Sequence, residues 1–112
     1  MDESKIYFRT GEADGIISIS PDVVSGIAAD AAIETQGVAG MAIAPSGGSR
    51  GVVINFSDDS CQVDAFILVR NGFVIADVAK EVQKSIKSAI EAGCGITVAN
   101  ANVYVAGIDM KN

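Results

Sequence analysis

The segment from Ile75 to Ile90 has the most regular spacing of hydrophobic residues in the chain. Its apolar side chains recur at steps of three and four, at Ile75, Val78, Ala79, Val82, Ile86, Ala89 and Ile90. This spacing is typical of a helix with one buried face. The glycines of Gly93-Cys94-Gly95 are expected to end the helix. We therefore predict a helix whose apolar face packs against a sheet.

A second helix is predicted to begin at Ser20-Pro21-Asp22, which supplies a hydroxyl cap, a proline for the first position and an acid in the first turn. It ends near Gly37. One face carries Val23, Val24, Ile27, Ala28, Ala31 and Ala32, and the polar residues Asp22, Ser25, Asp30 and Glu34 lie elsewhere. Gly26 costs this helix about 1 kcal/mol relative to alanine. Either the helix tolerates that cost or a neighbour approaches closely there.

Runs rich in β-branched or small residues predict five strands, at 16–20, 38–44, 52–56, 63–70 and 96–108. The Gly-rich segment 45–51 is expected to be a plain hairpin turn, and the polar segment 57–60 a second turn. The three middle strands would then form a meander. After Ala101 the last strand alternates, with Val103 and Val105 on one face and Asn102, Tyr104 and Ala106 on the other.

The predicted order is strand, helix, three strands, helix, strand, which indicates an α+β two-layer sandwich. We expect a mixed β-sheet of about five strands with two main helices on one face. The other face or an edge of the sheet would then be available for contacts. Residues 1–14 are expected to be an acidic, flexible N-terminal tail, and residues 15–112 a single domain.

Charge and composition exclude several classes of function. The 112 residues include 8 basic and 14 acidic side chains and no histidine, so the net charge is 8 − 14 = −6. The missing histidine excludes Ser-His-Asp and Cys-His nucleophiles and histidine-ligated zinc. The acidic balance argues against nucleic acid as the main ligand, because that affinity depends largely on Lys and Arg.

The two cysteines indicate a reducing compartment, and the first fifteen residues have the character of a cytosolic protein. Cys61 and Cys94 lie in or beside apolar runs without a second soft-ligand pair, so we interpret them as buried free thiols. The first fifteen residues have no apolar core typical of a secretion signal. The longest uncharged stretch, 92–108, is short and contains glycines and asparagines, so direct membrane insertion is not expected.

The candidate anion site is the turn Ser46-Gly47-Gly48-Ser49-Arg50-Gly51, whose backbone N–H groups could bind an anion beside Arg50. It lacks the lysine and the following helix of a P-loop, and a plain turn is the expected interpretation. The segments 37–40 and 48–51 also match the G-x-x-G of an RNA-binding KH loop. That match is weak in a chain with 12 glycines.

Three groups of charged residues are candidate sites, and each is better explained as solvated surface. Asp58, Asp59 and Asp64 lack the spacing of a calcium loop. The basic strip Lys80, Lys84 and Lys87 is interrupted by acids, and the pair Asp30 and Glu34 has no functional group beside it. The sequence therefore predicts no catalytic, cofactor-binding or metal-binding residues, and the protein is expected not to be an enzyme.

Two sets of motifs resemble the alkaline shock protein family, also called Gls-type general stress proteins. The first half has Gly15-Ile16-Ile17-Ser18-Ile19-Ser20-Pro21-Asp22-Val23-Val24, followed by 27–28, 31–32 and Gly37-Val38-Ala39-Gly40-Met41. The second half has Gly72, Val78-Ala79-Lys80-Glu81-Val82-Gln83, Cys94-Gly95 and Asn102-Val103-Tyr104-Val105-Ala106-Gly107. The family usually has threonine at Cys94, valine at Ala101 and a proline near 74–76, so the chain departs from the pattern there.

The resemblance implies a cytoplasmic, non-enzymatic protein of Gram-positive bacteria linked to cell-envelope homeostasis and alkaline stress. It also implies self-association and attachment to the membrane through a separate, membrane-anchored protein partner. We expect function through protein-protein interaction. The alternative is a nucleic-acid or small-anion binding domain that uses the Gly48–Gly51 loop and Arg50.

Overall fold

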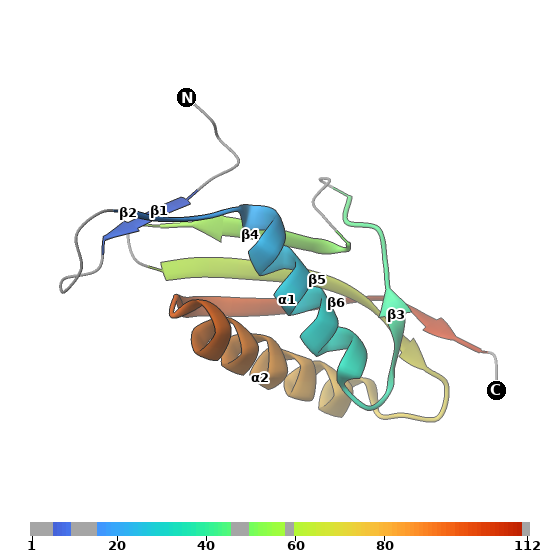
Figure 1. Cartoon of the computed structure of the whole chain (residues 1–112). Coiled ribbons are helices and arrows are strands. Elements are labelled where there is room, and N and C mark those ends of the chain that lie inside the picture. The colour runs from blue at the N-terminus through green and yellow to red at the C-terminus, as the bar shows by residue number, and fades with distance from the viewer. Residues whose placement is uncertain (1–5, 10–15, 46–49, 58–59, 111–112) are drawn as a thin grey trace.

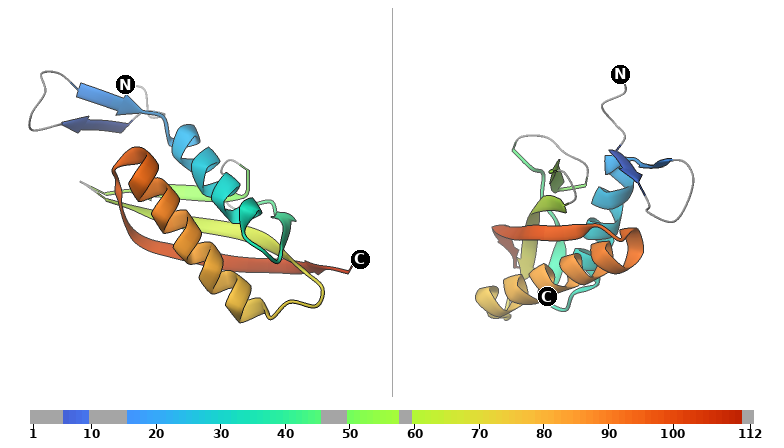
Figure 2. Two further views of the ribbon diagram at one scale, coloured as in Figure 1. Left: turned by 60° about the horizontal axis from the view of Figure 1, so that its bottom comes forward. Right: turned by 90° about the vertical axis from the view of Figure 1, so that its left-hand side faces the viewer.

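The structure, a computed structural model, describes residues 6–9, 16–45, 50–57 and 60–110. Its elements, in chain order, are β1 (Ile6–Arg9), β2 (Ile16–Ile19), α1 (Pro21–Glu34), β3 (Val38–Met41), β4 (Val52–Phe56), β5 (Ser60–Arg70), α2 (Ile75–Cys94) and β6 (Thr97–Asp109). Both helices lie on the same side of a four-stranded sheet (Figures 1 and 2). The predicted α+β fold, with a mixed sheet covered by helices on one face, is confirmed.

The main sheet has four strands because the first predicted strand does not join it. That segment forms β2, which pairs antiparallel with β1 to make a separate two-stranded sheet. Figure 2 shows this pair beyond the start of α1. Residues 6–9, which fall within the predicted N-terminal tail, are therefore a strand.

The sheet is organised around β5, which pairs with the three other strands. β6 runs parallel along its whole length, while β4 pairs antiparallel with 61–65 and β3 with 67–69. Phe66 lies between these two antiparallel segments. Its N–H donates to the Gly51 carbonyl, and its own carbonyl accepts from the Ala42 N–H. β3 and β4 therefore lie end to end along one edge of β5.

This arrangement contradicts the predicted meander and the plain hairpin at 45–51. β3 pairs with β5 rather than with β4. The physical reason is length: β5 has 11 residues, and β3 and β4 have 4 and 5, so both short strands fit in sequence along it. Residues 46–49 of the predicted turn lie outside the described residues, but the strands before and after the turn lie end to end on one edge of β5 rather than side by side.

The core lies between β5 and the helices. Alternate residues of β5 are buried with the apolar face of α2, and this set comprises Cys61, Val63, Ala65, Ile67, Val69, Val78, Val82, Ile86 and Ile90. α1 contributes small residues, and the Thr35 hydroxyl at its end donates to Ser85 Oγ on α2 at 3.2 Å. None of the described helices is long and apolar enough to span a bilayer.

The predicted helix ends are confirmed, but the predicted buried face of α1 is partly wrong. Ser20 Oγ accepts a hydrogen bond from the Asp22 N–H, and Gly95 caps α2 in the left-handed conformation. Val23 is 53% exposed, whereas Ser25 is 4% exposed. α1 packs against both α2 and the β3–β4 edge. The buried side of α1 therefore excludes Val23 and includes Ser25, a small polar residue.

Both cysteines are free thiols, as predicted, although only Cys61 is fully buried. Burial raises the pKa of Cys61, and the nearby Cys94 and Glu91 raise it further. Burial also raises the pKa of Cys94. Both side chains are therefore protonated at neutral pH.

We expect Gly51→Ala to lower the free energy of unfolding by about 2 kcal/mol or more. Gly51 has a φ of 78°, and a Cβ there would collide with the Ala42 carbonyl oxygen. Gly26→Ala is the matched control, because its Cβ would meet Arg50 Nη1 at an ordinary 3.5 Å. That change should stabilise α1 by about 1 kcal/mol. Urea unfolding measures both, and equal stability of Gly51→Ala and wild type would contradict the strand junction.

The raised pKa of Cys61 predicts that stability falls as the pH rises above about 8.5. In that range the unfolded thiol has lost its proton while the folded thiol keeps it, so folding requires proton uptake. Cys61→Ala should weaken this dependence. The measurement is urea unfolding between pH 7 and pH 10. An identical slope in the variant and the wild type would show that Cys61 does not cause it.

Candidate functional site

Neither helix covers the opposite face of the sheet in the described part of the chain (Figure 2). Side chains alternate along a strand, so the residues between the buried positions of β5 point to this side. The strand register places their partners on β4 and β6 on the same side. We call this surface the open face; it comprises Val53, Asn55, Gln62, Asp64, Phe66, Leu68, Asn100, Asn102 and Tyr104.

A stacked pair of aromatic rings lies at the centre of the open face. The Phe66 and Tyr104 ring centroids are 4.8 Å apart, and the rings are inclined by 16°. The Tyr104 residue is nevertheless 48% exposed. Leu68 continues the apolar surface beside this pair, and a Cβ on the neighbouring Gly107 would lie 3.4 Å from it. The glycine thus leaves Leu68 accessible on that side.

The end of the open face that lies nearer the start of β5 is polar. Asn102 Nδ2 donates to Asp64 Oδ1 at 2.9 Å, across the β5–β6 pair. The next row of the register contains Asn55, Gln62 and Asn100. The open face therefore combines an aromatic centre with an amide-rich end, and Asp64 is its charged residue.

The three aspartates considered as a cation site are not assembled into one. Asp64 accepts the Asn102 hydrogen bond, and Asp58 and Asp59 lie outside the described residues. Among the residues that the structure describes, no cluster of three Cys, Asp or Glu could hold a metal ion.

Arg50, the cation of the candidate anion loop, is bound within the protein. Its Nη2 lies 2.7 Å from Asp30 Oδ1 on α1. Gly47, Gly48 and Ser49 lie outside the described residues, whereas Gly51 packs at the strand junction. Asp30 belongs to the candidate pair Asp30 and Glu34, so this ion pair links that pair to the candidate anion loop. The Asp30 carboxylate partly neutralises the positive charge of Arg50 to which an anion would bind.

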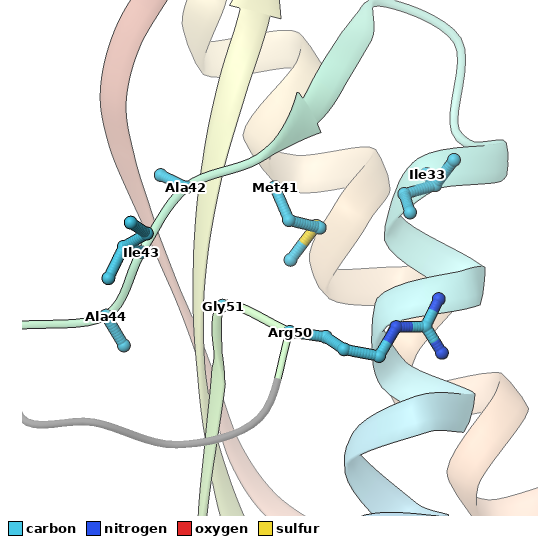
Figure 3. A pocket seen from close by; sticks show the side chains of 7 residues that line it. All are labelled: Ile33, Met41, Ala42, Ile43, Ala44, Arg50 and Gly51. Atoms are coloured by element: carbon cyan, nitrogen blue, oxygen red, sulfur yellow. The ribbon is translucent and has the colours of Figure 1, made fainter.

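A pocket of about 360 Å³ lies beside Arg50, between α1 and the start of β4. Its lining is mostly apolar: Ile33, Met41, Ala42, Ile43, Ala44, Arg50 and Gly51. Figure 3 shows the Arg50 side chain extending toward α1 rather than into the space beside Ile43. Ile43 itself is 93% exposed. The pocket therefore presents a shallow apolar surface rather than a group of convergent polar side chains.

The other candidates are surface features. Lys80, Lys84 and Lys87 lie on the solvent side of α2, and Lys84 Nζ lies 3.8 Å from Glu81. Glu34 is exposed at the end of α1. In the first G-x-x-G segment, a Cβ on Gly37 would collide with Val78 and Phe73, so this glycine serves packing.

The sequence predicted an available sheet face or edge but did not identify the residues at its centre. The sequence did contain one signal for these residues, the alternation of side chains in 60–70 and 102–106. It places Phe66 and Tyr104 on the other face of the sheet from their buried neighbours. The parallel pairing of β5 with β6 brings the two rings together. Nothing in the spacing of the residues specified that register.

Curated proteins similar to this chain are described only as uncharacterized. YloU of Bacillus subtilis is 30% identical over 110 residues, covering 88% of this chain and 92% of the relative. Spy1614 of Streptococcus pyogenes is 31% identical over 107 residues, covering 85% and 88%. YqhY of Bacillus subtilis is 29% identical and covers 84% and 77%.

Among solved structures, variants of the MamM CTD have a similar fold. One has a TM-score of 0.54 and 16% identity, covering 78% of this chain and 94% of that chain. At such identity the likeness concerns the fold alone. The model of the alkaline shock protein 23 family, described by a cell envelope-related function, matches residues 9–110. The chain therefore belongs to the alkaline shock protein family, as its motifs indicate.

Proposed function

We propose that this protein is a non-enzymatic, cytoplasmic member of the family that acts at the cell envelope through protein-protein contacts of its open face. The observation that carries the proposal is the stacked Phe66–Tyr104 pair at the centre of a sheet face without helices. Half-exposed aromatic residues are common anchors of protein interfaces. The partners are further copies of the chain or a membrane-anchored protein.

The chemistry of the described residues supports an interaction role over catalysis. The chain has no histidine, and the two thiols have raised pKa values. A raised pKa keeps a thiol protonated, which is the opposite of what a cysteine nucleophile needs. The pocket beside Arg50 has mainly apolar walls, and the Arg50 side chain that lines it is paired with Asp30.

The charges of the open face support a protein partner over nucleic acid. The residues that define this face include Asp64 and no lysine or arginine. The whole chain carries a net charge of −6. A phosphate backbone would meet repulsion there, whereas aromatic, amide and aliphatic groups suit a protein surface.

We expect Tyr104→Ser to weaken partner binding by at least about tenfold, because it removes a large apolar contact and uncovers Phe66. Tyr104→Phe keeps the ring stack and is the matched control. The measurement is recovery of cross-linked partners from the envelope fraction of the native organism. Light scattering after size-exclusion chromatography measures self-association in parallel.

The wild type and Tyr104→Phe should retain the same partner or oligomer, and Tyr104→Ser should lose it while its thermal unfolding remains cooperative. A wild type that is strictly monomeric and recovers no envelope protein would contradict the proposal. Equal binding by all three proteins would show that the open face is not the contact surface.

A further inference from the structure

A groove runs along the junction of α1 and α2, which lie side by side (Figure 2). Two adjoining hollows of about 370 Å³ and about 460 Å³ form it, and both are lined by Thr35 and Ser85. The first hollow extends to Asp77 in the first turn of α2, and the second extends to Ala89. These two residues are 89 − 77 = 12 positions apart on α2, so the groove is about 18 Å long. We call this surface the helix groove.

The helix groove is acidic. Among the described residues that line its two hollows, Glu34, Asp77 and Glu81 are acidic and none is basic. In the described part of the chain, only Glu81 of these three has a cation within ion-pair distance, the exposed Lys84 at 3.8 Å. Exposed pairs of this length are weak. Most of the negative charge of the helix groove is therefore available to a partner.

Phe73 forms an aromatic wall at the Asp77 end of the helix groove. Its side chain lies over Gly37, where an added Cβ would be 2.9 Å from the Phe73 Cδ1 atom, and the residue is still 40% exposed. The aliphatic stem of a lysine or arginine can pack on such a ring, and its charged head is attracted to the ring face. Asp77 and Glu81 are one helical turn apart on the same side of α2, so both can contact that charge.

The second hollow of the helix groove is lined mainly by small residues. They are Ala31, Ser85, Ser88 and Ala89. Short side chains let the backbone of another helix approach closely. The Thr35 hydroxyl at the end of α1 donates to Ser85 Oγ at 3.2 Å, and this bond joins the two helices within the groove. The helix groove is therefore formed before any partner binds.

Charge and length together identify the kind of occupant. A second copy of the chain has a net charge of −6 and would be repelled by the acidic groove, as would nucleic acid. A metal ion does not fit either, because no cluster of three Cys, Asp or Glu among the described residues could hold one. A small free amine would occupy one end of the groove. The occupant that matches the whole length is a positively charged segment of polypeptide.

We propose that the helix groove binds a basic amphipathic helix of another protein. Lysine or arginine side chains of that helix contact Asp77 and Glu81 at one end of the groove and Glu34 further along, and the first stem packs on Phe73. The small residues between them accept the body of the helix. This site goes beyond the proposed function, because both helices lie on the other side of the sheet from the open face (Figure 2).

Asp22 and Asp77 allow a matched test. Each is an exposed acid in the first turn of its helix, Asp22 on α1 and Asp77 on α2. Asp22 lies at the opposite end of α1 from Glu34 and does not line either hollow. Asp77→Lys and Asp22→Lys therefore change the net charge equally, and each removes the same favourable charge from a helix N-terminus. Only Asp77→Lys alters the helix groove.

The probe is a synthetic helix-forming peptide of about 15 residues, made of alanine, leucine and lysine, with the lysines at steps of three and four along one side. A second peptide has glutamate in place of lysine. Isothermal titration calorimetry with the full chain measures binding. We expect the lysine peptide to bind wild type, and to bind Asp22→Lys at least about fivefold more tightly than Asp77→Lys. We expect no binding of the glutamate peptide.

Circular dichroism checks the fold of each variant. If Asp77→Lys does not fold, Asp77→Asn and Asp22→Asn are compared in the same way, with the same direction expected. A wild type that does not bind the lysine peptide would overturn the inference. Equal affinity of the two matched variants would also overturn it, because binding would then depend on net charge alone.

Tyr104→Ser separates this inference from the proposed function. We expect this variant to bind the lysine peptide as tightly as wild type does, because Tyr104 lies on the open face. Loss of peptide binding in Tyr104→Ser would place the peptide on the open face and would overturn the inference. Loss of envelope partners in Tyr104→Ser, with peptide binding retained, would support both proposals independently.

Discussion

The alternation of side chains along β5 is the constraint on which the rest of the structure depends. Every second residue from Cys61 to Val69 is buried beneath the helices, and the residues between them lie on the open face. A pairing shift of one residue would exchange these two sets. Because β3, β4 and β6 all pair with β5, this strand positions the whole sheet. The pattern that buries Ile67 under the helices therefore also places Phe66 beside Tyr104 on the open face.

Local signals predicted the helices well and the strand partners poorly. The three- and four-residue spacing from Ile75 to Ile90 specified α2, and Ser20-Pro21 specified the start of α1, because these features act within one element. The turn residues near Gly51 predicted a hairpin, but such residues do not determine which strands pair. The length of β5 and the backbone bonds of Phe66 to Gly51 and Ala42, which flank β4 and β3, explain the end-to-end arrangement. The exposure of Val23 likewise depends on where α1 docks.

The candidate surface was predictable in kind but not in its residues. Helices on one face of a sheet imply an open face, and the sequence pattern was sufficient to predict that. The Phe66–Tyr104 contact requires the parallel register of β5 and β6, which depends on the path of α2 between them. The pairing of Arg50 with Asp30 also joins distant segments. It explains why a loop that resembles an anion site is instead tied to α1.

We propose that the open face of the sheet, rather than the charged helix surface, makes the contacts between copies of this chain. Amide hydrogen exchange of the full chain, compared between dilute and concentrated solution, tests it most directly. We expect slower exchange at high concentration in the strands that carry the open face, β4, β5 and β6. Slower exchange on the outer faces of α1 and α2 instead, or no dependence on concentration, would contradict it.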